Sequence, residues 1–176
     1  MNKYIEGMIK MKKNKFKSVI LLFCMLFVIA SCSSFTKAMP EDFHFEITWG
    51  AFGSSYYNSE TGELIKKKDE NIQTTYFMGE ENLRKVYDII FENKIYKINK
   101  LSSFGFLFSD PAGEYEITIY ANNEEKVITA PYGADISRSP YTIKAYRFAI
   151  AIEKIRSIIC ESEEWKALKD PEYWYM

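Results

Sequence analysis

A run of twelve uncharged residues near the N-terminus most constrains the fold, because it sets a leader apart from the chain that can fold. The run covers 19–30, reads VILLFCMLFVIA, and follows five lysines between positions 10 and 17. Twelve helical residues span roughly 18 Å, well short of a hydrocarbon core of about 30 Å. A basic segment followed by a short apolar one is typical of a secretory signal peptide. Met11 is an alternative start, since MKKNKFK alone forms such a basic segment.

The end of the leader, Ile29-Ala30-Ser31-Cys32, resembles the bacterial lipoprotein signal, in which an aliphatic residue and two small residues precede a cysteine. The resemblance implies cleavage before Cys32 and lipidation of its thiol, because several acyl chains give an anchoring that one chain does not. Two alternatives stay open: an ordinary secretory signal with Cys32 incidental, and an uncleaved membrane anchor. We expect residues 1–31 to be removed, 32–41 to form the lipidated cysteine and a short tether, and 42–176 to form a single domain.

Charge and location follow from removing the leader. The full sequence has 23 basic and 24 acidic residues, and residues 1–31 hold six of the lysines and one glutamate. The acidic remainder lacks the concentrated positive field that phosphate binding requires, so we expect no nucleic-acid partner. It is also repelled by anionic head groups and should stand off the membrane. The expected location is the extracytoplasmic face of the cell membrane, or the periplasm or outer membrane if the cell is Gram-negative.

Two kinds of hydrophobic spacing, one typical of helices and one typical of strands, follow each other along the domain and predict its fold class. Apolar spacings of three and four predict amphipathic helices over about 80–94 and from Tyr141 to Ile159. Hairpin connections imply antiparallel pairing, so the order of elements predicts an α+β fold: an antiparallel twisted sheet of about five strands with two amphipathic helices packed on one face. Extended segments are predicted at 43–49, 54–58, 64–68, 72–78, 115–119 and 126–130, with a polar loop over 131–140.

The last predicted hairpin has two candidate registers. A two-residue loop at Asn122-Asn123 sets Ile119 opposite Lys126. A loop extended to Glu125 sets Ile119 opposite Ile128 instead. We favour the longer loop, because it pairs apolar residues with one another on one face of the sheet.

The sequence offers no motif for catalysis, metal binding or a cofactor. It lacks the GxSxG, P-loop, GxGxxG, HExxH and CxxC patterns. The single histidine, His44, falls on the polar face of the first strand, where a surface role is expected. Glu161, Glu163 and Glu164 are better explained as a solvated helix start than as a metal site. We expect no catalytic residue, no metal and no cofactor, although a hydrolase built on paired carboxylates would leave no local signature.

Cysteines and a run of lysines are further candidates for functional residues. With Cys24 in the leader and Cys32 in the lipidation motif, no internal disulfide is available to the domain. Cys160 follows two isoleucines and is expected to be a buried small hydrophobic residue, not a nucleophile. The run Lys66-Lys67-Lys68 is interpreted as a solvated hairpin, with an electrostatic docking patch as the alternative.

Most phenylalanines fall at alternating or helical positions and are expected in the core. Four other aromatic residues follow no period: Trp165, Tyr173, Trp174 and Tyr175. We favour their packing over the domain's own core. Otherwise they form an exposed surface that binds a protein, peptide or glycan partner.

Short motifs of the domain resemble a group of small bacterial lipoproteins without an established activity. They are Ile47-Thr48-Trp49-Gly50, the hairpin over 55–64, Thr74-Thr75-Tyr76 and the segment 163–168. The resemblance covers most of the domain and implies a location and a family, but no catalytic residues. The leading function is therefore a non-catalytic binding or interaction module of the cell envelope, held to the lipid bilayer by acylated Cys32.

Two other functions stay open: a small hydrolase of envelope polymers or peptides, and a structural spacer. An enzyme should bring two or more titratable groups with shifted pKa values together in a cleft. A binding module should show exposed aromatic or apolar surface with scattered acids. A spacer should show neither feature.

Overall fold

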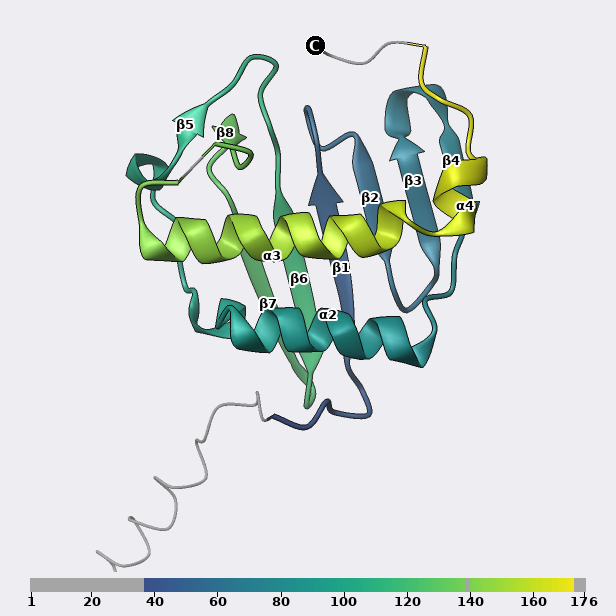
Figure 1. Cartoon of the computed structure of the whole chain (residues 1–176), viewed down its shortest axis with the longest axis horizontal. Helices are drawn as coiled ribbons and strands as arrows, with labels where there is room; N and C mark the ends of the chain where they lie inside the picture. The colour runs from purple at the N-terminus through teal and green to yellow at the C-terminus, as the bar shows by residue number, and fades with distance from the viewer. Residues whose placement is uncertain (1–36, 139, 173–176) are drawn as a thin grey trace, which may run out of the picture. The chain divides into compact units, whose positions relative to one another are not determined.

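The computed structural model describes residues 37–138 and 140–172, which belong to one compact unit. A six-stranded antiparallel sheet carries two long helices on one face, with a small two-stranded sheet beside it (Figure 1). The predicted α+β class is therefore confirmed. The main sheet has the order β4-β3-β2-β1-β6-β7, with β1 at His44–Trp49, β2 at Ser55–Asn58, β3 at Glu63–Lys67, β4 at Ile72–Thr75, β6 at Glu116–Ala121 and β7 at Glu124–Thr129.

The helices begin where the sequence supplies caps. Helix α3 (Ile143–Cys160) starts at Thr142, whose hydroxyl oxygen accepts a hydrogen bond from the Ala145 N–H at 3.2 Å. The apolar face predicted for the helix from Tyr141 to Ile159 is buried from Ala145 onward. Tyr141 itself lies before the cap and is exposed. Helix α2 (Glu80–Glu92) has two glutamates in its first turn, which suit the positive end of the helix dipole. A short helix, α4 (Glu163–Ala167), follows α3.

The core lies between the helices and one face of the sheet. In β1, Phe45, Ile47 and Trp49 are buried against the helices, while the alternate residues are only half-buried on the helix-free face. Tyr87 of α2 and Ile152 of α3 are fully buried in the same cluster. Every residue of this buried cluster lies between positions 43 and 159, so this stretch of the chain holds the core that the structure describes.

The β6–β7 hairpin takes the register that the sequence analysis rejected. Ile119 lies opposite Lys126, and Ile117 lies opposite Ile128. Asn122 and Asn123 have φ values of 54° and 59°, the pattern of a two-residue type I′ turn. The two registers differ by two positions, so both place the same side chains on the core face. Hydrophobic pairing therefore does not discriminate between them, and the turn residues decide.

Asp42 fastens this turn to the start of β1. Its Oδ1 accepts the Asn122 N–H at 2.9 Å and its Oδ2 accepts the Asn123 N–H at 2.7 Å. Hydrogen bonds from Asn123 and Asn122 hold the pKa of the Asp42 carboxyl below its ordinary value. The turn that the sequence encodes locally is thus held by a residue far away in the chain.

Replacing Asp42 by alanine should lower the urea midpoint of unfolding at neutral pH. Because the folded-state pKa of Asp42 is lowered, its stabilisation is complete above the unfolded-state pKa and is lost as the pH falls through the folded-state pKa. The gap between wild type and variant should therefore close in acid. Urea titrations from neutral pH to about pH 2 measure this gap, and a gap that stays constant would contradict the assignment.

A small sheet occupies part of the chain that we expected to be a polar loop. β5 (Leu107–Phe108) pairs with β8 (Ala134–Asp135), with Phe108 opposite Ala134. Neither strand has enough residues to show a period, which is why the sequence did not reveal them. No helix among the described residues is long and apolar enough to cross a membrane.

The expectation that the run Lys66-Lys67-Lys68 is solvated is wrong for its first two lysines, whereas Lys68 is exposed. Lys66 and Lys67 are buried, with exposed fractions of 5% and 4%. The Lys66 ammonium donates to Asp170 Oδ1 at 2.8 Å and to the Leu168 carbonyl at 3.2 Å. Lys67 Nζ lies 3.8 Å from Asp69 Oδ2. For Lys66, the partners come from the C-terminal segment, so local charge spacing gave no sign of them.

Candidate functional site

The strongest candidate site is a hollow of about 600 Å³ lined by Ser103, Phe104, Phe106, Phe108 and Tyr141, here called the aromatic corner. Phe106 forms a buried floor, 3% exposed. Phe104, Tyr141 and Phe108 surround it with exposed fractions of 82%, 64% and 53%. The hollow is therefore an apolar surface that stands open to solvent.

Backbone hydrogen bonds between distant segments hold the aromatic corner together. Phe104 sits in a single 3₁₀ turn, Ser103–Gly105, and the Tyr141 N–H donates to the Gly105 carbonyl at 2.9 Å. A Cβ at Gly105 would meet Ala145 Cβ at 3.0 Å, so a glycine lets the turn pack on the start of α3. Phe108 is fixed by the pairing of β5 with β8. The rings are thus presented by a defined backbone.

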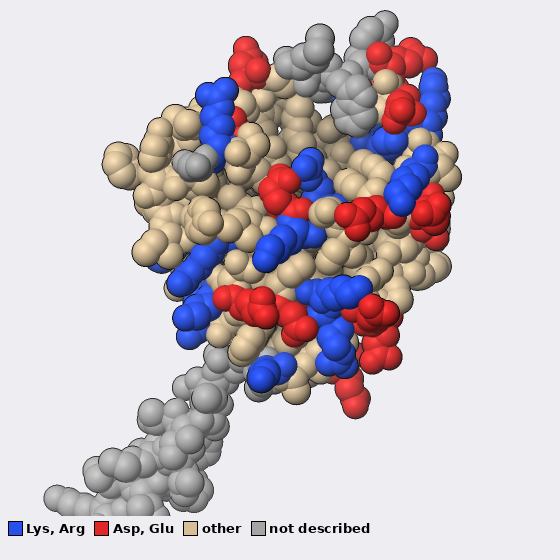
Figure 2. All heavy atoms as spheres, viewed as in Figure 1, with Lys and Arg blue, Asp and Glu red and all other residues tan. Residues whose placement is uncertain are grey.

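Other large hydrophobic side chains are exposed near the same elements. These side chains lie in the β7–β8 connection and at the start of α3. Figure 2 shows that uncharged surface predominates on the left of the view, where Figure 1 places β5, β8 and the start of α3. Large exposed apolar patches on monomeric proteins often mark interaction sites. These additional residues are Tyr132, Ile143 and Tyr146, with exposed fractions of 63%, 71% and 53%.

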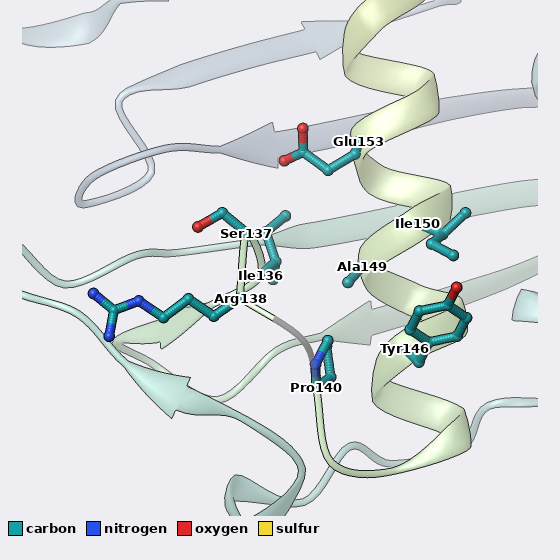
Figure 3. Close-up of a pocket in the computed structure, with 8 residues that line it drawn as sticks. All are labelled: Ile136, Ser137, Arg138, Pro140, Tyr146, Ala149, Ile150 and Glu153. Atoms are coloured by element: carbon teal, nitrogen blue, oxygen red, sulfur yellow. The ribbon is translucent and has the colours of Figure 1, made fainter.

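A second hollow, of about 350 Å³, lies between residues 136–138 and Pro140 on one side and α3 on the other (Figure 3). Two carboxylates at or next to this hollow already have partners. Asp135 accepts hydrogen bonds from the Ser137 hydroxyl at 2.6 Å and lies 3.1 Å from Arg138 Nε. Glu153 pairs with Arg156 at 2.6 Å, and Figure 3 shows the Arg138 side chain directed away from α3. These local pairs engage the carboxylates of Asp135 and Glu153.

A polar cluster on the helix-free face of the sheet includes the only histidine. Glu46 accepts hydrogen bonds from the Tyr56 hydroxyl at 2.8 Å and the Tyr120 hydroxyl at 3.2 Å. The His44 ring stacks on Tyr120 at 4.3 Å, and its Nε2 lies 3.5 Å from Glu60 Oε2. Burial, together with the hydrogen bond to Glu46, raises the pKa of Tyr56 to about 12. That shift moves the phenol further from proton transfer at neutral pH.

Cys160 is half-buried, and burial raises the pKa of its thiol to about 11. A thiol with a raised pKa is a poor nucleophile, because the thiolate is the reactive form. Among the described residues, no group of three His, Cys, Asp or Glu side chains could hold a metal ion.

Trp165 packs against the domain, as the sequence analysis favoured. Its ring lies 5.6 Å from that of Trp49, and the Lys66 ammonium sits 5.5 Å above it. It lies on α4, at the opposite end of α3 from the aromatic corner (Figure 1). The other residues predicted as sites lie outside the described residues: Cys32, Tyr173, Trp174 and Tyr175.

Sequence reasoning missed the aromatic corner, although a signal was present. Phe104, Phe106 and Phe108 alternate along the chain, which we interpreted as core packing. Phe106 is buried as expected, but Phe104 and Phe108, two residues before and after it, are exposed to solvent. A scan against protein-family models and a search of curated proteins found no match to this chain. Its likeness to small bacterial lipoproteins therefore stays a prediction from short motifs.

Proposed function

We propose that the protein is a lipid-anchored binding module of the cell envelope. Acylated Cys32 would hold it to the bilayer, and the aromatic corner would bind a protein or peptide partner. The exposure of Phe104, Tyr141 and Phe108 around a buried apolar floor carries this proposal. Large aromatic rings that are already held in place lose little conformational freedom on binding and are common anchors of interfaces.

The position of the aromatic corner relative to the start of β1 also supports this function. The described chain enters β1 beside the β6–β7 turn, to which Asp42 is bonded. Figure 1 shows β5 and β8 towards the other end of the strands. The described part of the chain therefore begins at the end of the sheet away from the aromatic corner. A hydrolase has weaker support, because only Ser103 and Tyr141 bring hydroxyl groups to the hollow.

Replacing Cys32 by serine should abolish labelling by radioactive palmitate and release the protein from the membrane fraction. The reason is that a serine hydroxyl does not take the place of the thiol that the signal presents for lipidation. Mass analysis of the mature N-terminus checks the wild-type modification. An unmodified Cys32 in the wild type would refute the anchoring part of the proposal.

A photo-crosslinking residue at position 104 should capture a discrete envelope protein in intact cells. The same residue at position 81 is the matched control, because Glu81 is exposed on α2, away from the corner. We expect Phe104→Ser to change the free energy of unfolding by less than about 0.5 kcal/mol, since the ring is 82% exposed. Equal capture at both positions, or none at 104, would argue against the corner as the binding surface.

A further inference from the structure

The outer edge of β7 is an unpaired strand edge. The two-residue turn makes Ala121 and Glu124 a hydrogen-bonded pair, and such pairs alternate along an antiparallel ladder. The bond from the Ala130 N–H to the Tyr115 carbonyl, at 2.8 Å, fits this alternation. The backbone N–H and C=O groups of the intervening residues therefore point away from β6. In the part of the chain that the structure describes, no strand pairs with them; they belong to Glu125, Val127 and Thr129.

A groove of about 390 Å³ runs along this edge. One wall is the β7 side, residues 127–131, and the other is the segment 99–103. The Lys126 ammonium donates to the Tyr96 carbonyl and to Asn99 Oδ1, which holds the second wall beside the strand. Ser103 lines both this groove and the aromatic corner, so the two hollows adjoin.

We propose that β7 accepts an extended peptide segment of an envelope partner as an added strand, with a large apolar side chain of that peptide in the aromatic corner. The proposal rests on the proposed function and names the partner chemistry for the same site. Main-chain hydrogen bonds to a free edge give affinity in this mode, and adjoining side-chain pockets give selectivity. The unpaired edge requires an extended chain, and the neighbouring aromatic rings require an apolar side chain on it.

The charges on β7 favour a single peptide over a second copy of this chain as the occupant of this edge. The segment 99–103 lines the side of the groove that faces β7. The first half of β7 also carries Glu124, Glu125 and Lys126, and charged residues on an edge strand discourage sheet-to-sheet pairing. The second half, from Val127, is uncharged, and Val127 itself is 47% exposed.

A proline at position 127 tests the edge directly. The outward N–H of Val127 makes no bond to β6, so V127P removes an edge donor without removing a ladder bond. The matched control is Q73P on β4, the opposite edge of the same sheet. The hydrogen bond from the Tyr76 N–H to the Gly62 carbonyl shows which residues of β4 bond to β3. By the alternation of an antiparallel ladder, the backbone N–H of Gln73 points away from β3, as that of Val127 points away from β6. Thermal unfolding verifies that both variants fold.

The probe is a phage-displayed library of linear ten-residue peptides, panned against residues 32–176 carrying C32S. Selected peptides should contain a large apolar or aromatic residue and bind at least tenfold more weakly to V127P and to F104S, but not to Q73P. N-methylation of one alternating set of peptide amides should abolish binding, and methylation of the other set should not. The methylated peptides keep the test decisive if V127P fails to fold.

Three results would overturn strand addition. One is selected peptides that tolerate both V127P and methylation of either amide set. Another is a dimer in light scattering that V127P dissociates, which would make a second copy the occupant. The third is capture of a partner at position 104 when no linear peptide is selected, which would leave the proposed function standing with a folded partner surface. Absence of both capture and selected peptides would remove the proposed function as well.

Discussion

Replacing Ile152 by alanine should lower the free energy of unfolding by about 2–5 kcal/mol, through lost transfer energy and a residual cavity. The side chain is fully buried in α3, at the centre of the helix-sheet core. A domain of this size has only about 5–15 kcal/mol of stability in total. The variant should therefore unfold at a clearly lower urea concentration, measured by circular dichroism.

The matched control is Lys154→Ala, two residues further along the same helix. Lys154 is exposed and its replacement should change the free energy of unfolding by less than about 0.5 kcal/mol. Because both substitutions introduce alanine into one helix, helix propensity is nearly balanced between them. Equal losses in the two variants would contradict the packing of α3 on the sheet.

Replacing Trp165 by alanine should cost about 2–3 kcal/mol, less than the roughly 3–5 kcal/mol of a fully buried tryptophan. Trp165 is only half-buried, but it covers Trp49, which is 3% exposed. The variant also removes the ring beneath the buried Lys66 ammonium. We expect a lower urea midpoint together with a red shift of the remaining tryptophan emission, because Trp49 becomes solvated.

Lys166→Ala is the control for this second prediction. Lys166 neighbours Trp165 on α4 but is exposed, and its ion pair with Glu163 at 3.1 Å lies at the surface. Such pairs contribute about 0–1 kcal/mol. If the Trp165 and Lys166 variants behave alike, α4 and the tryptophan do not stabilise the core as we infer.

Sequence periodicity predicted the layers of this fold because burial repeats with the geometry of each element. Alternation in β1 marks one face covered by helices, and the stripe through Phe148, Ile152 and Ile155 marks the buried side of α3. Details that depend on distant residues were not predictable in this way. Lys66 is buried because Asp170 and Trp165, from the far end of the chain, supply its partners.

The candidate site was less predictable than the fold for a related reason. Phe104 and Phe108 look like core residues in the sequence, since hydrophobic character alone does not distinguish burial from display. Their exposure depends on a short 3₁₀ turn and on a two-residue strand pair, and neither has a periodic signature. The predicted register of the β6–β7 hairpin was wrong for a local reason. Asn122 and Asn123 both adopt positive φ values and so form a tight two-residue turn, which fixes the register where hydrophobic pairing does not.

The central place of β1 affects the order in which the chain can fold. Its neighbour β2 follows at once, whereas its other neighbour, β6, comes only after α2 and a long connection. Closing that connection costs chain entropy before any pairing is gained, so the β1–β6 ladder should form late. Until then β1 is itself a free edge with Phe45 and Ile47 uncovered, which favours association between nascent chains. The tight turn between β6 and β7 would shorten this interval, because a preformed hairpin can dock on β1 in one step.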